Sequence, residues 1–398
     1  MHVCYMTTED LSVGSTSGKV HFLAVSKELL KLGHQVTILS PRYGSSEISL
    51  PDKLVGLHYW VPGKNALGLF WFEVWLAFVA AWIKLRYRPD VLLVRGGGPG
   101  WIPGLFFCVF RLWGIPVVLE CNGITWTEFA QRGFSRLATK LVYFSAWQQA
   151  VSANRLIGVT SEIADAYAKL GRRCPSKSYA ISNGTYPEQF NFNKQKRFAS
   201  RQRLGIHDDT LVVGYVGAFS RWHGVTQVAQ AAKELQEGSG QENVLFLLVG
   251  SGNSWNDIDD LRKTHHLENL RLTGQTIDRE ELRDLVACFD VGLCTYTSIH
   301  GSSLKLFEYM AAGIPILASG FPEVLRIVKE HEVGIVLDSP TPQAITDSIR
   351  TILHDREHWQ NVGLRGREVV TDNYSWSHTA QHVERVLLDA RGIETSRH

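Results

Sequence analysis

The chain has 398 residues, which exceeds one ordinary hydrophobic core and fits two domains of roughly 150 to 200 residues. Hydrophobic residues make up 44% and charged residues 20%, the balance of a folded globular protein. The formal net charge of +2 argues against nucleic acid as the main partner, because a phosphate backbone calls for a strongly basic face.

The cysteines and the N-terminal residues indicate the cellular compartment of the protein. The six cysteines include no CxxC pair and lie in no metal-ligand cluster, so we expect a reduced compartment and no metal site. The stretch MHVCYMTTED lacks the basic and apolar regions of a signal peptide. We therefore expect a cytoplasmic protein.

The first half of the chain alternates apolar strands with helical patterns. Residues 20–34 repeat apolar side chains at three- and four-residue spacing and reach Gly33 at their end, which is typical of an amphipathic helix. Strands, each with the loop after it, are expected at 2–7, 35–41, 90–98, 115–123, 153–161 and 176–186. This alternation predicts βαβ units around a parallel sheet, with ligands bound beyond the carboxyl ends of the strands.

Loops that follow these strands carry candidate ligand contacts. Gly14 and Gly18 come just after the first strand, where a Gly-rich turn lets the backbone approach a phosphate or sugar; a plain loop is the alternative. Arg95 opens an Arg-Gly-Gly-Gly run, and it either binds an acceptor or a phosphate or forms a salt bridge. Glu120 and Asn122 follow another strand and are expected to face the same way.

A long apolar segment raises the question of a membrane. Residues 66–89 are apolar except for Glu73 until Lys84, and about 20 such residues can span a bilayer. A second apolar segment, 101–113, is too short to span. Helices packed on a sheet are the favoured interpretation; a Trp-rich face resting on the cytoplasmic side of a membrane, and a true span, are the alternatives.

The amino-acid composition changes near residue 187. Residues 187–203, PEQFNFNKQKRFASRQR, are polar and basic and are interpreted as a linker with a short helix. Strand-like segments then resume at 210–220, 243–252, 270–275, 290–296, 314–319 and 333–338. We therefore predict an N-terminal α/β domain over 1–186 and a second over 187–376, with a C-terminal helix at about 377–398 that packs back on the first.

Residues 301–319, GSSLKLFEYMAAGIPILAS, combine three features of a phosphate-binding helix start. Ser302 and Ser303 supply hydroxyl groups where a helix begins, and Lys305 adds a cation one turn in. Glu308 follows, and the segment then runs directly into an apolar strand. The pattern indicates a phosphate- and sugar-binding end on a helix of an α/β domain.

Several stretches, in order, resemble family 4 glycosyltransferases. They include GSTSGKVHFLAVSKELLKLGHQVTIL and YAISNGTYPEQF in the first half, and VGYVGAFSRWHGVTQVAQAA, LLVGSGN, LRLTGQ, SSLKLFEYMAAGIPILAS and VGIVLDSPT in the second. The resemblance spans nearly the whole chain. It implies the GT-B fold, an α/β architecture of two facing Rossmann-like domains with a cleft between them.

The resemblance also implies roles for particular residues. Lys305 would stabilise the leaving diphosphate and Glu308 would accept both ribose hydroxyls, while Glu120 and Asn122 complete the candidate catalytic residues. The implied donor-binding set is Gly18, Gly217, Arg221, His223, Gly250, Gly274, Ile277, His300, Ser302, Ser303 and Leu304, and Gly14 and Arg95 lie on the acceptor side. No cofactor or metal is implied, since Asp259-Asp260 lies in a helical, charged stretch.

The chain departs from the family pattern at several positions. His300 stands where the family has the first of two glutamates spaced eight apart, and Ala218 and His223 stand where it has a phosphate-binding arginine and lysine. Asn122 aligns with the family's catalytic-loop histidine. Arg221 and Trp222 lie in the same loop as His223 and are candidate replacements.

Three functions remain open at this point. The leading one is a retaining glycosyltransferase that takes a UDP-, GDP- or ADP-sugar and delivers the sugar to a glycan or lipid-linked acceptor. The second is a sugar-nucleotide epimerase or hydrolase of the same fold. The third, suggested by His300, Ala218 and Asn122, is a catalytically silent nucleotide-binding partner subunit.

Overall fold

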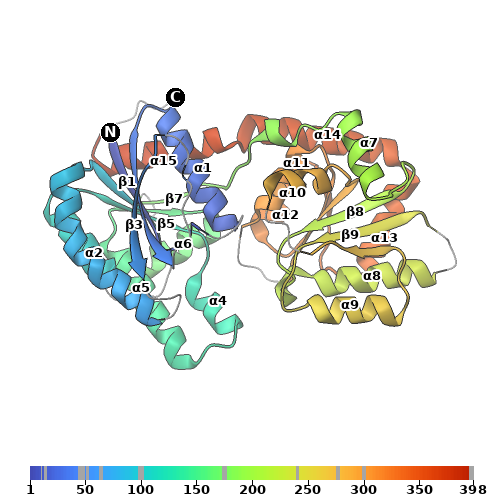
Figure 1. The fold of residues 1–398 in the computed structure, drawn as a ribbon, viewed down its shortest axis with the longest axis horizontal. Helices are drawn as coiled ribbons and strands as arrows, with labels where there is room; N and C mark the ends of the chain where they lie inside the picture. The colour runs from blue at the N-terminus through green and yellow to red at the C-terminus, as the bar shows by residue number, and fades with distance from the viewer. Residues whose placement is uncertain are drawn as a thin grey trace. The chain divides into compact units, whose positions relative to one another are not determined.

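The computed structural model describes residues 1–9, 11–12, 16–43, 50, 53–61, 66–96, 103–172, 177–238, 242–274, 278–297 and 302–393. The chain forms two compact units (Figure 1). The first comprises Met1–Asn183, His300–Ser302 and Trp376–His398, and the second Gly184–Ile299 and Ser303–Ser375. Each unit is a parallel sheet between layers of helices, as the α/β prediction requires.

The first unit contains a sheet whose described strands run in the order β3-β2-β1-β4-β5-β6-β7, all parallel. Their bounds are β1 His2–Thr7, β2 Gln35–Tyr43, β3 Val55–Val61, β4 Val91–Gly96, β5 Val117–Cys121, β6 Arg155–Gly158 and β7 Ser178–Ala180. All were predicted except β3. This strand lies at the edge and pairs only with β2, so it lacks the continuous buried apolar run of the central strands.

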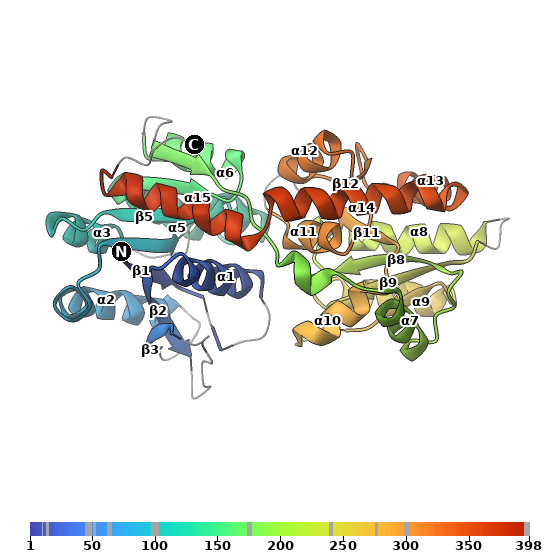
Figure 2. The same ribbon diagram turned by 90° about the horizontal axis from the view of Figure 1, so that it is seen from above.

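Helices cover both faces of the first sheet. Helices α1 and α15 contact each other on one face, and α2, α3, α5 and α6 follow one another across the other (Figures 1 and 2). The bounds are α1 Ser17–Lys31, α2 Ala66–Tyr87, α3 Pro103–Leu112, α4 Thr125–Gln131, α5 Arg136–Ser152, α6 Ser161–Leu170 and α15 Trp376–Ala390.

Helix α15, from the end of the chain, is tied into the first unit by polar contacts. Asp389 accepts hydrogen bonds from Arg155 Nε at 2.5 Å and from Tyr179 Oη at 2.6 Å. Glu384 lies 2.6 Å from His34 Nε2, at the end of α1. The first unit is therefore built from both ends of the sequence.

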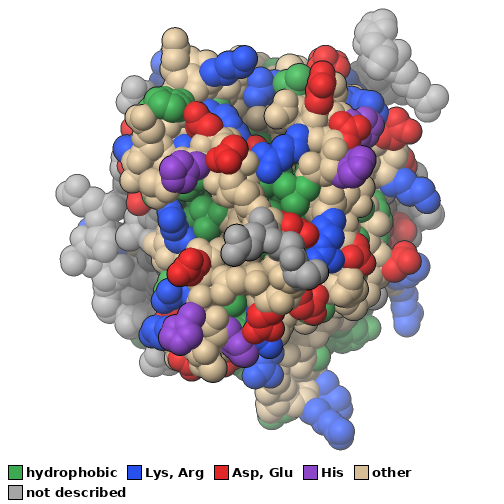
Figure 3. Space-filling model, turned by 90° about the vertical axis from the view of Figure 1, so that its right-hand side faces the viewer, with side chains coloured by type: hydrophobic (Ala, Val, Ile, Leu, Met, Phe, Trp, Pro, Cys, Tyr) green, Lys and Arg blue, Asp and Glu red, His purple; other side chains and the backbone are tan. Residues whose placement is uncertain are grey.

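The second unit contains a sheet in the order β10-β9-β8-β11-β12-β13. The strands are β8 Leu211–Val216, β9 Val244–Val249, β10 Leu270–Leu272, β11 Val291–Thr295, β12 Ile316–Ser319 and β13 Gly334–Val336. One core lies between the sheet and α8, α9 and α13, and the other between the sheet and α10, α11 and α12. Figure 3 shows one face of the molecule, on which positive and negative side chains are interspersed.

The remaining elements of the second unit are its helices. They are η2 Pro187–Phe190, α7 Lys194–Arg203, η3 Arg221–His223, α8 Val225–Glu237, α9 Trp255–Thr264, α10 Arg279–Val286, α11 Leu304–Ala311, α12 Pro322–Glu330, α13 Pro342–His354 and α14 Arg356–Asn373.

The short helix predicted within residues 187–203 is present as α7, but the interpretation of this segment as a linker is wrong. Helix α7 packs into the second unit, where the buried Arg201 donates to Asp290 Oδ2 at 2.5 Å and to Cys288 O at 2.9 Å. Arg197 also donates to Asp290, which in turn accepts from Val212 N in β8 at 2.8 Å. A basic segment is ordered here because one carboxylate at the start of β11 neutralises two of its arginines.

Asp290→Ala should lower the free energy of unfolding by about 3 to 5 kcal/mol, because it leaves a buried guanidinium without its counter-charge. Asp284→Ala is the matched control: it removes a carboxylate paired with the exposed Lys196 and Arg203, and should cost about 1 kcal/mol or less. Urea unfolding of both variants measures the difference. Equal losses would show that the Asp290 cluster contributes no more than a surface pair.

Candidate functional site

Three glycines meet where strands β8, β9 and β10 end. Gly217 N donates to Val249 O at 2.9 Å, and Gly250 N donates to Gly274 O at 2.8 Å. Gly250 has φ 144°, and a Cβ atom there would lie 1.9 Å from Gly217 O. Only glycine fits this approach, so the backbone after β8 and the backbone after β9 pack directly against each other at the carboxyl ends of the strands.

Helix α11 begins beside these glycines. Its first residue is Leu304, and Ser303 before it hydrogen-bonds through Oγ to Tyr296 Oη at 2.6 Å. The first turn contains no acidic residue. The N–H groups of a first turn have no partner within their helix and carry partial positive charge, which favours an anion.

Lys305 brings a full positive charge to this helix start. Its Nζ is buried and has no hydrogen-bond acceptor among the residues that the structure describes. The ammonium lies 3.8 Å from the ring centroid of Tyr215 and 5.2 Å from that of Tyr296, so aromatic faces are its main contacts. Burial lowers the pKa of Lys305 to about 8, although Glu308 nearby acts in the opposite direction. At neutral pH the site still contains a cation that lacks an anion.

The loop from Gly217 to Gly224 forms another wall of the site. His223 Nδ1 donates to Ala218 O at 2.6 Å, and its ring packs edge-on against Tyr296. Burial, together with the charge of Lys305, lowers the pKa of His223 to about 4. His223 is therefore neutral at pH 7. Arg221 is exposed in the same loop.

Glu308 lies one turn after Lys305 and is already paired. Its Oε1 accepts from Arg279 Nη2 at 2.6 Å, and the side chain is buried. Arg279 begins α10 and was not found by sequence reasoning, because no motif marks it. Tyr215 and Tyr296 were also missed, since an aromatic residue in a strand usually indicates only packing.

The first unit holds a buried polar network at the carboxyl ends of β1 and β5. Glu120 accepts from Tyr5 Oη at 2.5 Å and from His21 Nε2 at 2.5 Å. His21 Nδ1 donates to Asn183 Oδ1 at 2.6 Å. Burial alone would raise the pKa of Glu120, but the charge and hydrogen bond of His21, with Arg95 and Tyr5, outweigh it and lower the pKa to about 2. His21 was not singled out from the sequence.

The other predicted residues are placed as follows. Ser302 belongs to the first unit and accepts from Asn183 Nδ2 at 2.8 Å, while Ser303 belongs to the second. Asn122 is half-buried just after β5. Gly14, Ile277 and His300 lie outside the described residues. Thus Lys305, Ser303, Leu304, Gly217 and His223 come together, and Glu120, Arg95 and Gly18 form a separate group in the first unit.

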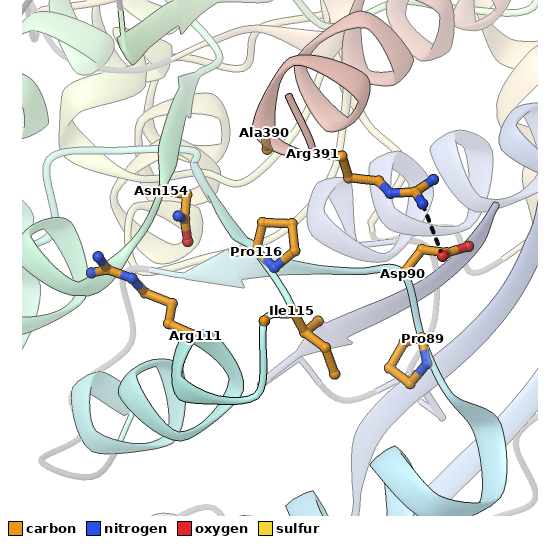
Figure 4. A pocket seen from close by; sticks show the side chains of 9 residues that line it. Pro89, Asp90, Arg111, Ile115, Pro116, Asn154, Ala390 and Arg391 are labelled. Carbon is orange, nitrogen blue, oxygen red and sulfur yellow. Dashed lines mark ion pairs between the residues drawn. The ribbon is translucent and has the colours of Figure 1, made fainter. Parts of the chain in front are cut away.

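A pocket of about 560 Å³ lies at the opposite, amino end of strands β4, β5 and β6 (Figure 4). It contains an ion pair in which Arg391 Nη2 lies 3.1 Å from Asp90 Oδ1. Its lining is Pro89, Asp90, Arg111, Gly114, Ile115, Pro116, Asn154, Ala390 and Arg391. Parallel α/β sheets bind ligands at their carboxyl ends, so this pocket is not the candidate site.

Two features are absent from the described part of the chain. No group of three or more His, Cys, Asp or Glu side chains there is arranged to hold a metal ion. None of the helices there has both the length and the apolar character needed to cross a membrane.

Solved structures share the fold of this protein. HepE of Anabaena in complex with UDP superposes with a TM-score of 0.74 at 15% identity, covering 98% of this chain and 100% of that chain. WaaG, a glycosyltransferase involved in lipopolysaccharide biosynthesis, superposes with a TM-score of 0.74 at 17% identity, covering 97% and 99%. The predicted fold is confirmed: two Rossmann-like parallel-sheet domains of the GT-B type.

Matches to two family models identify the protein family. The family model "Glycosyl transferases group 1" matches residues 196–369, and "Glycosyltransferase Family 4" matches residues 18–189. The chain belongs to the family 4 glycosyltransferases and is a transferase enzyme, as the sequence resemblance predicted.

Two curated relatives illustrate the range of similarity. An uncharacterized glycosyltransferase of Methanocaldococcus jannaschii is 20% identical over 64% of this chain, and the match spans 65% of that relative's length. A D-inositol 3-phosphate glycosyltransferase of Corynebacterium glutamicum is 24% identical over 95% of this chain and 93% of its own length.

Because Glu120 is buried and paired, the free energy of unfolding should depend on pH in the acid range. Its folded pKa of about 2 lies below the ordinary 4.5, so its contribution is present above pH 4.5 and is lost as pH falls toward 2. The contribution is about 3 kcal/mol if the whole shift is realised. The difference in unfolding free energy between the wild type and Glu120→Gln should therefore shrink by about that amount between pH 6 and pH 2.5. Glu280→Gln, at an 82% exposed side chain, is the control and should show a difference independent of pH. A constant difference for Glu120→Gln as well would contradict the network.

Proposed function

We propose that this protein is a metal-independent, retaining glycosyltransferase that moves a hexosyl group from a UDP-, GDP- or ADP-sugar to a glycan or lipid-linked sugar acceptor. The observation that carries the proposal is the buried ammonium of Lys305, which has no acceptor among the described residues and stands at the start of α11. A diphosphate bound there would supply the missing anion. The UDP bound by HepE makes UDP-sugars the first donors to test.

In the proposed reaction, the anomeric carbon–oxygen bond to the diphosphate breaks and a bond to the acceptor oxygen forms on the same face of the sugar. The acceptor proton passes to the departing phosphate oxygen. Negative charge grows on the diphosphate as this happens. Lys305 and the first-turn N–H groups of α11 are already oriented toward that charge, so they stabilise the transition state without reorganising.

Glu308 and Glu120 have different proposed roles. We propose that Glu308 meets the ribose hydroxyls through Oε2, since its Oε1 accepts from Arg279. Both oxygens of Glu120 already accept hydrogen bonds from Tyr5 and His21, so this carboxylate is better suited to hold His21 than to act as a base. Asn122 remains a predicted contact in the place of the family's catalytic-loop histidine.

The test begins with thermal shifts on UDP, GDP and ADP, because a ligand that binds only the folded state raises stability. The matching nucleotide sugars then serve as donors, with release of the nucleoside diphosphate as readout. Lys305→Met should lower turnover by about 10² to 10³, the scale for one transition-state donor. It should not lower stability, because it removes a buried charge that has no partner.

Lys263→Ala, which removes a 64% exposed lysine of the same unit, is the control and should leave turnover unchanged. If Lys305→Met turns over at a near-normal rate, another cation such as Arg221 must stabilise the departing diphosphate. If no nucleotide or nucleotide sugar binds the wild type, the proposed function is wrong.

We further propose that the first unit rests on a membrane surface. In α2 the exposed side chains Trp71, Trp75, Phe78, Trp82 and Leu85 recur at three- and four-residue spacing, so they share one face of the helix. Phe78 is 75% exposed, and the opposite face, which includes Leu76 and Ile83, is buried. From the sequence, a membrane-facing surface was an alternative to core packing for this segment and for residues 101–113, where Leu112 of α3 is 85% exposed.

Helix α5 extends the apolar surface, and this was not predicted. It exposes Leu137, Leu141, Phe144, Trp147 and Val151 along one side, and α3 contacts both α2 and α5. Its sequence contains no acidic residue, and Arg136 and Lys140 are exposed beside the apolar stripe. Aromatic side chains flanked by cations suit the boundary of an anionic bilayer, where each cation contributes about 1 kcal/mol.

The double variant Trp75→Glu/Phe144→Glu should reduce sedimentation with phosphatidylserine-containing liposomes by about tenfold or more, because each side chain loses apolar burial and gains repulsion. High salt should release the wild type. Leu364→Glu, at a 50% exposed apolar residue of the second unit, is the control and should sediment normally. Binding unaffected by the double variant would refute this face.

A further inference from the structure

A carboxylate of the chain occupies an anion position in the first unit. Glu9, just after β1, packs against Gly18 in the first turn of α1, so closely that a Cβ on Gly18 would lie 1.7 Å from Glu9 Oε1. The first turn of α1 has no acidic residue of its own. Lys19 N is capped by Thr16 Oγ1 and Val20 N by Thr16 O, so the N–H groups of Ser17 and Gly18 are left without an intrahelical acceptor. Glu9 therefore lies where a helix favours negative charge.

Arg95 is the second, independent sign of an anion position. It ends β4, and its side chain is only 7% exposed. Its Nε donates to Glu9 Oε1 across a long 3.4 Å. Its buried Nη1 has no hydrogen-bond acceptor among the described residues. The nearest carboxylate oxygen on the buried side, Glu120 Oε2, is 3.8 Å away and already accepts from Tyr5.

Among the residues that the structure describes, these contacts leave the guanidinium with one long hydrogen bond and one nitrogen, Nη1, without an acceptor. Arginine usually binds carboxylates and phosphates with two parallel hydrogen bonds, but here Glu9 supplies one weak bond. The Glu9 side chain is 35% exposed, so it can turn into water at little cost. A phosphate or free carboxylate in its place could accept from Arg95 Nε and from the N–H groups of the first turn of α1.

We propose that Arg95, Gly18 and the start of α1 form a subsite for an anionic group on the acceptor, a phosphate or a carboxylate, and that Glu9 occupies it until the acceptor arrives. The inference rests on the proposed glycosyltransferase function and deepens it by naming the acceptor's chemistry. It assigns the anion to the acceptor because Lys305 already provides the cation for the donor diphosphate. Sequence reasoning placed Arg95 on the acceptor side but Gly18 on the donor side.

The probe is inorganic phosphate, titrated calorimetrically into protein saturated with UDP. The wild type should bind phosphate, and Glu9→Gln should bind it about tenfold more tightly, because the competing charge-assisted contact is gone. Arg95→Gln should lose binding, and Arg95→Lys should restore part of it. Lys305→Met should bind phosphate as the wild type does. Asp165→Asn, at an exposed carboxylate of α6, controls for the general effect of removing a negative charge.

Three outcomes overturn the subsite. Phosphate that competes with UDP and is lost in Lys305→Met belongs to the donor diphosphate. Phosphate that fails to bind both the wild type and Glu9→Gln shows that no such subsite exists, as does equal affinity in Glu9→Gln and Asp165→Asn. Because Glu9→Gln leaves the Glu120 network intact, the test does not depend on whether Arg95→Gln folds.

The two proposals fail separately. If UDP does not bind the wild type, the proposed donor function fails, and the phosphate titration is repeated without UDP. Tighter phosphate binding by Glu9→Gln in that experiment would still establish the anion subsite.

Discussion

A buried ammonium that lacks a hydrogen-bond acceptor is expensive, and a protein retains one only where something else compensates for it. In this chain the ring faces of Tyr215 and Tyr296 stabilise Lys305 partly, and Gly217 after β8 lacks a Cβ that would lie 3.1 Å from Lys305 Nζ. Gly217, the two tyrosines and the start of α11 thus all contribute to the surroundings of the Lys305 charge. The second unit is organised around a charge to which none of its described residues offers a hydrogen-bond acceptor.

The first unit solves the same problem differently. Its buried charges alternate: Arg95 lies between Glu9 and Glu120, and Glu120 lies between Tyr5 and His21. Nearly every group has a partner, and the exception is one guanidinium nitrogen. Such a network is rigid and sensitive to the loss of any member. The family 4 scaffold therefore combines a pre-organised polar core in one unit with an unsatisfied cation in the other.

Sequence patterns predicted what is local. Apolar runs identified every central strand, and the small residues before Leu304 identified the start of α11 together with Lys305. Contacts between distant residues were beyond reach: Glu120 and His21 are 99 residues apart, and Arg201 and Asp290 are 89 apart. The supposed linker fails for this reason, since a basic segment looks solvated until its buried carboxylate is known. Arg279 was missed for the same reason, because its role in the site comes from its hydrogen bond to the distant Glu308.

The position of α15 affects how the molecule is made. Arg155, Tyr179 and His34 all find their partners on a helix that is translated after the whole second unit. During synthesis one face of the first sheet stays incomplete, because α1 lacks its neighbour α15. By then all strands of the second unit have been translated. The nascent first unit is thus a stage at which a chaperone has apolar surface to bind, and a helix translated after the second unit completes the domain that was started first.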